Sequence, residues 1–169
     1  MKKRTRAREL ALQFLYQLDL RGESVLPEAA RWIRSEDRDA ETAEFALRLV
    51  EGAHAHREEI DRVISGVAQN WNLERMAVVD RNVLRLATHE LLHCPDIPPK
   101  VAINEAIELG KRFSTQNSGA FINGILDKIM NRDGAATSVA SPEEPAAAPS
   151  GSVGDAPAAR SPAAPSPGE

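Results

Sequence analysis

The stretch VAINEAIELGKRFSTQNSGAFINGILDKI, residues 101–129, encodes two amphipathic helices and a polar joint between them. At about 100° per residue, each helix gathers apolar residues on one arc about 140° wide, which is typical of a core-facing helix. The first arc holds Val101, Ala102, Ala106, Leu109 and Phe113, and the second holds Phe121, Ile122, Ile125, Leu126 and Ile129. Ser118, in the joint, is a candidate N-cap for the second helix. A helical hairpin with this much apolar surface needs further helices to cover it.

Helical periodicity also fills the sequence before this hairpin. The first helix carries Leu10, Phe14 and Leu18 on its core arc and ends at Gly22. The other expected segments are a short helix over 24–35, a third that begins at Asp39 or Thr42, a fourth over 60–67 after a break near 54–56, and the longest over 73–93 with a kink near Ala77. No stretch shows a sustained alternation of apolar and polar residues. The sequence therefore predicts an all-α fold, a compact bundle of about seven helices.

The composition changes sharply after Asp133. Of the 36 residues from Gly134 to Glu169, 28 are Ala, Pro, Ser or Gly. Such a segment cannot bury enough apolar surface to offset the entropy lost on ordering, so we expect it to be disordered. The predicted organisation is a helical domain over 1–133 and a disordered C-terminal tail over 134–169.

The charge balance limits the kinds of partner that the chain can attract. The formal net charge is −4, and the tail contributes −3 of it, so the helical domain is close to neutral. A nucleic-acid site must therefore come from local clustering of cations. A single cysteine, Cys94, excludes an internal disulfide and fits a reducing compartment. No apolar run approaches the ~20 residues that span a bilayer, so we expect a cytoplasmic protein without membrane contact.

The sequence lacks the residue patterns that enzymes and metal sites need. Glu90 and Glu105 fall within apolar arcs, but no nucleophile accompanies them. We therefore assign both to structure, with helix-start N–H groups or Lys100 as partners. His89 and His93 lie one helical turn apart but flank the core arc, so no metal site is expected. No nucleotide-binding or nucleophile motif occurs, and we expect neither enzymatic activity nor a cofactor.

Five positive charges lie within the first eight residues, at Lys2, Lys3, Arg4, Arg6 and Arg8. This basic N-terminal segment is either a solvated, frayed terminus or an arm that binds phosphate. The second role suits arginine, because its planar guanidinium donates two parallel hydrogen bonds. The first helix also carries Leu12 and Tyr16 on a face away from its core arc. That face could meet a partner protein or a second copy of the chain.

Further basic and aromatic residues are scattered over the later helices. Arg85 lies on the central helix away from its core arc, and Lys111 lies near the end of the helix that precedes the joint. Phe113 and Phe121 flank the joint, which contains Asn117. The two rings are either core residues or platforms on which an unpaired base stacks, the usual way in which single-stranded RNA is read.

Three segments resemble the NusB family of bacterial transcription antitermination factors. They are RARELALQFLYQLDL at 6–20, VDRNVLRLATHELL at 79–92, and VAINEAIELGKRF followed by FINGILDK within 101–129. They occur in the order and at the spacing of the family. The resemblance implies a factor that binds the single-stranded boxA element of nascent RNA together with NusE, which is also a small-subunit ribosomal protein. It further implies a place in the RNA polymerase antitermination complex, where the factor promotes processive transcription of ribosomal RNA operons.

The resemblance also assigns roles by position. It implies RNA contacts at Arg4, Arg6, Arg8, Arg85, Lys111, Phe113, Asn117 and Phe121, and contacts to NusE at Tyr16 and Asp80. The chain departs from the family at Thr5, which interrupts an arginine run, at Asn117, where an acidic residue can occur, and in its Ala/Pro-rich tail. A homodimer through Leu12 and Tyr16 remains an alternative use of that face.

Two other classes of function are compatible with the helical pattern. One is the helical module of a ribosomal RNA cytosine methyltransferase, which the disordered tail disfavours because it leaves no room for a cofactor domain. The other is a bundle that binds only proteins and whose basic N-terminal segment is incidental.

Overall fold

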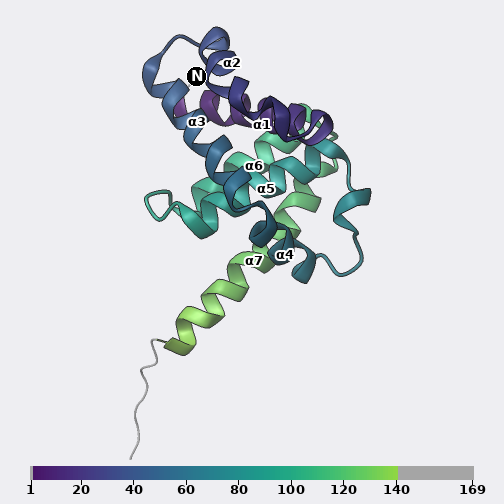
Figure 1. Ribbon diagram of the computed structural model, residues 1–169. Helices are drawn as coiled ribbons and strands as arrows, with labels where there is room; N and C mark the ends of the chain where they lie inside the picture. The colour runs from purple at the N-terminus through teal and green to yellow at the C-terminus, as the bar shows by residue number, and fades with distance from the viewer. Residues whose placement is uncertain (1, 141–169) are drawn as a thin grey trace, which may run out of the picture. The chain divides into compact units, whose positions relative to one another are not determined.

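The computed structural model describes residues 2–140, with 133–140 as backbone only. This part of the chain contains seven α-helices, two short 3₁₀ helices and no strand (Figure 1). The α-helices are α1 (Lys3–Arg21), α2 (Ala29–Glu36), α3 (Ala40–Ala55), α4 (Arg57–Val67), α5 (Val78–His93), α6 (Pro99–Phe113) and α7 (Ser118–Ala140). The 3₁₀ helices are η1 (Glu23–Glu28) and η2 (Leu73–Arg75). The predicted all-α fold of about seven helices is confirmed.

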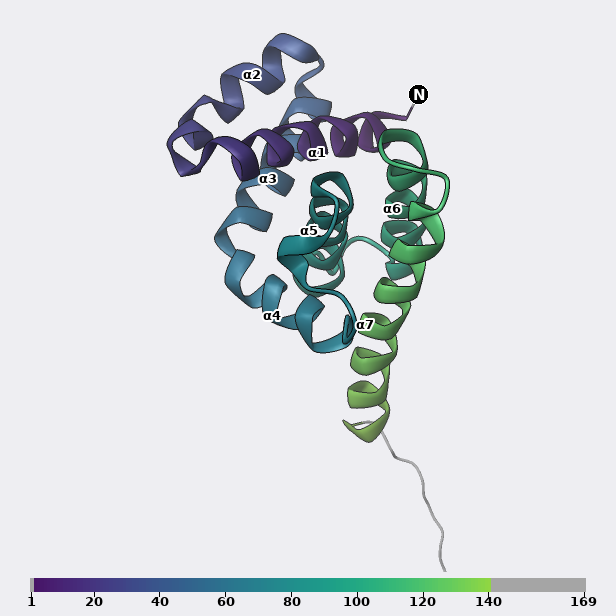
Figure 2. The same ribbon diagram turned by 90° about the vertical axis from the view of Figure 1, so that its right-hand side faces the viewer.

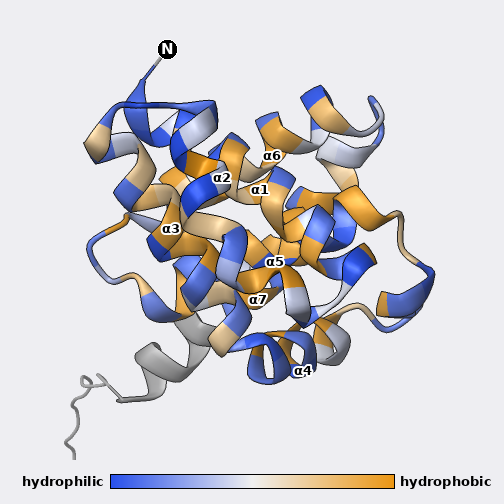
Figure 3. Ribbon diagram, turned by 45° about the horizontal axis from the view of Figure 1, so that its top comes forward, coloured by the Kyte–Doolittle hydropathy of each residue, from blue (hydrophilic) through white to orange (hydrophobic). Residues whose placement is uncertain are grey.

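The core is built around α5. Every residue from Asn82 to Glu90 is buried, the polar ones included, so this stretch of the helix has no solvent-facing side. Helices α1, α3, α4 and α6 pack against α5, and Figure 2 shows it enclosed among them. Hydrophobic residues concentrate toward the interior and hydrophilic ones on the outer helix faces (Figure 3). Polar side chains on a helix buried all round depend on partners inside the protein. Among the described residues, Thr88 Oγ1 and His89 Nδ1 are buried without one.

Local sequence signals set several helix ends. Gly22 ends α1 with a φ of 93°, a conformation that glycine adopts without strain. Asp39 caps α3, because its carboxylate accepts a hydrogen bond of 2.9 Å from the Thr42 backbone N–H. Pro99 occupies the first turn of α6, where a backbone N–H would have no helical partner. The predicted end of the first helix and start of the third are therefore confirmed.

Two predicted boundaries differ from the structure. The helix predicted over 73–93 is η2 followed by α5, because Met76 and Ala77 are extended, with ψ of 153° and 138°. Helix α5 is also shorter than α1 and α7. Helix α7 continues to Ala140, past the predicted domain boundary at 133. Disorder was predicted for 134–169, and residues 141–169 of that tail lie outside the described residues.

The α6–α7 hairpin is closely packed. A Cβ atom placed on Gly110 would lie 2.4 Å from Ile122 Cδ1, so the two helices approach each other through a glycine. Ser118, predicted as the cap of α7, is its first residue, and its hydroxyl donates a 3.0 Å hydrogen bond to Ser114 Oγ. Val101, predicted in the core arc, is instead exposed at the start of α6.

Three histidines meet where α3, α4 and α5 come together. The rings of His56 and His93 stack with 3.7 Å between their centroids, and the buried His89 ring lies 5.6 Å from His56. His93 Nε2 lies 2.8 Å from Glu59 Oε1. Burial lowers the pKa of His89 to about 4, and positive charge on His93, His56 and Arg48 acts in the same direction. His89 is therefore neutral in the folded protein at neutral pH.

Because His89 is buried in its neutral form, we expect the folded protein to lose stability in mild acid. The unfolded chain takes up a proton on His89 near pH 6.5, whereas the folded protein does so only near pH 4. The free energy of unfolding should therefore fall as the pH drops from 6.5 to 4, by on the order of 3 kcal/mol, and this contribution should level off below pH 4. Urea unfolding at several pH values measures it. The His89→Gln variant should show a shallower decline over that range, and parallel curves for the two proteins would contradict the prediction.

Candidate functional site

A buried ion pair joins the first half of α1 to the last turn of α5. Arg8 and Glu90 are each only 2% exposed, and three N–H···O contacts of 2.8, 3.0 and 3.1 Å join them. Glu105 on α6 lies 3.7 Å from the same guanidinium. Burial raises the pKa of Glu90, and Arg8 opposes that rise. Glu90 thus has the structural role expected of it, but its partner is Arg8 rather than Lys100 or a helix-start N–H group.

This ion pair corrects the expected exposure of Arg8. The basic N-terminal segment is helical from Lys3 onward, and its side chains do not all point to solvent. Arg8 faces the core, where carboxylates already occupy its donors. Its guanidinium is therefore unavailable to an RNA phosphate in this conformation.

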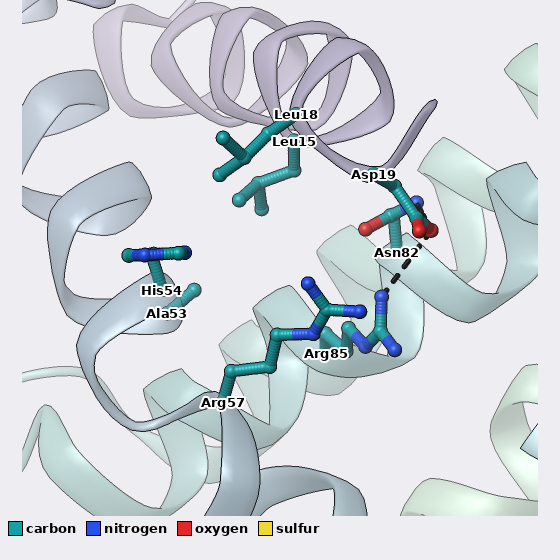
Figure 4. Close-up of a pocket in the computed structure, with 8 residues that line it drawn as sticks. All are labelled: Leu15, Leu18, Asp19, Ala53, His54, Arg57, Asn82 and Arg85. Carbon is teal, nitrogen blue, oxygen red and sulfur yellow. Dashed lines mark hydrogen bonds and ion pairs between the residues drawn. The ribbon is translucent and has the colours of Figure 1, made fainter. Parts of the chain in front are cut away.

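Arg85 is likewise buried and paired. Its Nε and Nη2 atoms donate to the two Asp61 oxygens at 2.8 and 3.0 Å, and its Nη1 donates to Asp19 at 3.2 Å. Asp19 also accepts from Arg81 at 2.8 Å and from the Asn82 amide at 3.0 Å, an arrangement seen in part in Figure 4. Burial raises the pKa of Asp19, but Asn82 and Arg81 outweigh it and hold that pKa below its usual value. Arg85 thus joins α5 to α1 and α4, which corrects its expected exposure.

Other cations from distant segments remain at least partly exposed and lie together. Glu9 on α1 is buried, and its carboxylate bonds Arg6 at 3.3 Å and also Arg112 at the end of α6. Arg112 lies 5.3 Å from the centroid of the Phe113 ring, which is half-buried. Lys111 is exposed on the same last turn. We call Arg6, Lys111 and Arg112 the basic edge. Glu9 holds it together, because it bonds Arg6 on α1 and Arg112 at the end of α6, next to the joint.

Arg4 lies on another side of α1, toward α3. Its guanidinium sits 4.3 Å from the centroid of the Phe45 ring and 3.9 Å from Asp96. Both Arg4 and Asp96 are about half exposed, so the pair is open to solvent. Arg4 can therefore exchange this carboxylate for a phosphate more readily than Arg8 can.

A second group of residues surrounds a pocket of about 370 Å³ between η2, the start of α5 and the joint. We call it the aromatic pocket; its lining residues are Trp71, Arg75, Met76, Ala77, Asp80, Thr115, Asn117, Ser118 and Phe121. The rings of Trp71 and Phe121 meet edge to face, with 5.1 Å between their centroids. Trp71 is 55% exposed, and Phe121 is half-buried against the core. The pocket brings Asp80, predicted to contact a protein, beside Asn117 and Phe121, predicted to contact RNA.

The first helix presents an exposed apolar pair near its end. Tyr16 is 39% exposed and Leu20, one turn later, is 58% exposed. Leu12 was predicted on the same face, but it is buried in the core, because that face of α1 is covered nearer its start. The available surface therefore consists of Tyr16 and Leu20 rather than Leu12 and Tyr16.

Sequence reasoning missed Trp71, Arg75, Glu9 and Leu20. The segment around Trp71 reads as a turn, and only the exposure of a large aromatic ring within it could have marked the residue. The sequence could have suggested an ion pair for Glu9, because Arg6 lies three residues before it on the same helix.

The part of the chain that the structure describes, residues 2–140, contains neither a metal-binding cluster nor a membrane-spanning helix. In that range no group of three or more His, Cys, Asp or Glu side chains is arranged to hold a metal ion. None of the helices there has both the length and the hydropathy that crossing a membrane requires.

Comparisons with known proteins agree on one family. The NusB family model matches residues 5–131. The transcription antitermination protein NusB of Anaeromyxobacter sp. (strain Fw109-5) is 56% identical over 128 residues, which cover 75% of this chain and 89% of that protein. Among solved structures, NusB of T. maritima is 40% identical with a TM-score of 0.62, and the match covers 76% of this chain and 90% of that one.

Another similar structure is a complex. It is a crystal structure of the antitermination factors NusB and NusE with double-stranded RNA, in which the matching chain is 31% identical. The TM-score is 0.65, and the match covers 78% of this chain and 98% of that one.

The ion pair yields a stability prediction. Arg8→Ala would leave the Glu90 carboxylate buried without its partner, so the free energy of unfolding should fall by on the order of 3–5 kcal/mol. Arg4→Ala removes an exposed arginine from the same helix and should change it by less than about 0.5 kcal/mol. Urea denaturation measures both. Equal small losses for the two variants would show that the ion pair does not hold α1 in place.

Proposed function

The chain belongs to the NusB family, and on that premise we propose that it is a non-enzymatic factor of transcription antitermination that binds RNA and a partner protein. The observation that carries this proposal is the basic edge. Glu9 holds the partly exposed Arg6 of α1 next to the exposed Arg112 of α6 beside the joint, although the domain as a whole is close to neutral. A cluster of this kind supplies the local attraction to phosphate that bulk charge does not.

The RNA that this surface would bind is single-stranded and of the boxA type. Phosphate contacts would come from Arg4 and the basic edge, and base contacts from the aromatic pocket. Exposed aromatic rings next to cations suit a single strand, because its unpaired bases can stack while its phosphates meet arginine. Phe113 and Phe121 fit the two roles considered for them, core packing and base stacking, because each packs on the core and keeps part of its surface exposed.

The partner protein would be NusE. Support comes from the exposed pair Tyr16 and Leu20, which forms an apolar spot on α1, and from the related complex that contains NusB and NusE. Asp80 was assigned to the same partner by position. With RNA and NusE bound, the factor would join the RNA polymerase antitermination complex and promote processive transcription of ribosomal RNA operons. A homodimer through Tyr16 is the alternative use of this spot.

Salt dependence tests the RNA surface. Each phosphate contact to a single strand contributes about 0.7 to the slope of log K against log salt, so Arg4/Lys111/Arg112→Ala, which leaves Arg6 to pair with the buried Glu9, should flatten that slope by about 2. Filter binding of boxA-type RNA at three salt concentrations measures it. The Arg21/Arg31/Arg34→Ala variant removes three exposed arginines elsewhere and should keep the wild-type slope. Parallel lines for wild type and the first variant would show that this surface never meets phosphate.

Calorimetry with purified NusE tests the partner surface. Tyr16→Ala should weaken NusE binding by on the order of tenfold or more, as expected for a tyrosine at the centre of an interface. Because Tyr16 lies outside the core, the free energy of unfolding should change by less than about 1 kcal/mol. Val101→Ala, which shortens an exposed apolar residue on α6, serves as the control and should bind normally. Wild-type affinity of Tyr16→Ala for NusE would contradict the assignment.

A further inference from the structure

Two arginines from different helices share one exposed carboxylate, that of Asp96 in the loop between α5 and α6. Arg48 on α3 donates to both Asp96 oxygens, at 2.8 and 3.3 Å, and Arg4 on α1 lies 3.9 Å from the same group. We call Arg4 and Arg48 the arginine clamp. We propose that the clamp is a phosphate site for the bound RNA, which Asp96 occupies until the RNA displaces it. The inference rests on the proposed RNA binding and adds to it Arg48, a contact on α3.

The Phe45 ring positions both cations of the clamp. The Arg4 guanidinium lies 4.3 Å and the Arg48 guanidinium 5.6 Å from the centroid of this ring. A guanidinium is attracted to the face of an aromatic ring. Phe45 is itself buried in the core, so its position is set by packing. The two guanidinium groups are therefore placed in the free protein, and less conformational entropy is lost when they bind an anion.

A phosphate can replace the carboxylate that the clamp holds. Both groups are anions whose oxygens accept two parallel hydrogen bonds from one guanidinium. Arg48 already presents its Nη1 and Nη2 atoms to two oxygens in this manner. The hydrogen bond from Arg48 also lowers the pKa of Asp96, so negative charge is favoured at this position. The same donors can serve one phosphate group.

The exchange is inexpensive because the ion pair lies at the surface. The side chains of Arg4, Arg48 and Asp96 are 54%, 45% and 47% exposed. An exposed ion pair contributes little to stability, so an incoming anion breaks it at low cost. Arg8 lies 5.5 Å from the same ring, but it is buried and held by Glu90. The exposed arginines at this ring can therefore change partners, whereas Arg8 cannot.

An open pocket of about 230 Å³ beside the clamp gives a strand room to reach it. Its lining residues are Lys3, Arg4, Glu41, Glu44, Phe45 and Arg48. Lys3 bonds Glu41 at 3.0 Å, so one of the two glutamates is already paired. The first turns of α1 direct Arg4 toward α3 and Arg6 toward Glu9 beside the joint. A strand bound at the basic edge can thus continue over the start of α1 to α3.

A double-mutant cycle tests the proposal by filter binding of boxA-type RNA to the full-length protein. Asp96→Asn should raise the affinity about two- to fivefold, because the RNA no longer has to break an exposed ion pair. In an Arg48→Ala background the same substitution should give less than half of that gain on a logarithmic scale. Glu44→Gln removes a carboxylate from the same pocket, and no ion pair joins it to Arg48 within residues 2–132. Any gain from this control should be equal with and without Arg48.

Salt dependence gives a second readout for Arg48. Arg48→Ala should flatten the slope of log K against log salt by about 0.7, the contribution of one phosphate contact to a single strand. Arg34→Ala removes an exposed arginine from α2 and should keep the wild-type slope. Because exposed ion pairs contribute little to stability, both variants should unfold at the urea concentration of the wild type.

The outcomes separate this inference from the proposed function. If wild type does not bind the RNA, both fail. If Arg4/Lys111/Arg112→Ala flattens the salt slope but Arg48→Ala leaves it unchanged, the RNA surface stands and the clamp is refuted. An equal gain from Asp96→Asn with and without Arg48 would also refute the clamp, because the gain would then reflect general charge. Loss of NusE binding by Arg48→Ala with unchanged RNA affinity would refute it too and would place Arg48 in a protein interface.

Discussion

The ion pair between Arg8 and Glu90 is the constraint on which the proposed surface depends. Two charges taken out of water are tolerated only when they satisfy each other, so α1 must lie where its arginine meets the carboxylate of α5. That placement determines where the neighbouring residues of α1 emerge. Glu9, the next residue, faces the end of α6 and holds Arg112 beside Arg6. A packing requirement in the core thereby sets the geometry of an exposed basic edge.

Six arginines on α1, α5 and α6 form two groups with different physical roles. Arg8, Arg81 and Arg85 are paired with carboxylates around α5 and connect the helices that pack on it. Arg4, Arg6 and Arg112 keep at least part of their side chains open to solvent, although Glu9, the carboxylate that pairs with Arg6 and Arg112, is itself buried. In the proposed function, only the second group is available to RNA phosphates. The structural arginines are neutralised by Glu90, Asp19 and Asp61. The exposed arginines lie on surfaces that the joint and α3 border.

The sequence was enough to predict most helices, the helix ends at Gly22 and Asp39, and the core of the α6–α7 hairpin. Each of these follows from local periodicity or a local hydrogen bond. The burial of polar residues could not be predicted in this way. A helical wheel places Arg85 away from the apolar arc, but it carries no information about Asp19 and Asp61, which arrive from other helices. Leu12 was expected to be exposed and is buried, and Val101 was expected to be buried and is exposed, because neighbouring elements decide which part of a helix face is covered. Trp71 could not be predicted as a site residue because a turn has no hydrophobic periodicity.

The central claim is that one RNA surface combines the start of α1 with the α6–α7 joint and Trp71. The most direct measurement is a titration of the isotope-labelled full-length protein with boxA-type single-stranded RNA, followed by backbone and indole N–H resonances. The account predicts the largest shift changes at Arg4, Arg6, residues 111–121 and the Trp71 indole, with little change in α2. Changes centred on α2, or spread evenly over the molecule, would contradict it.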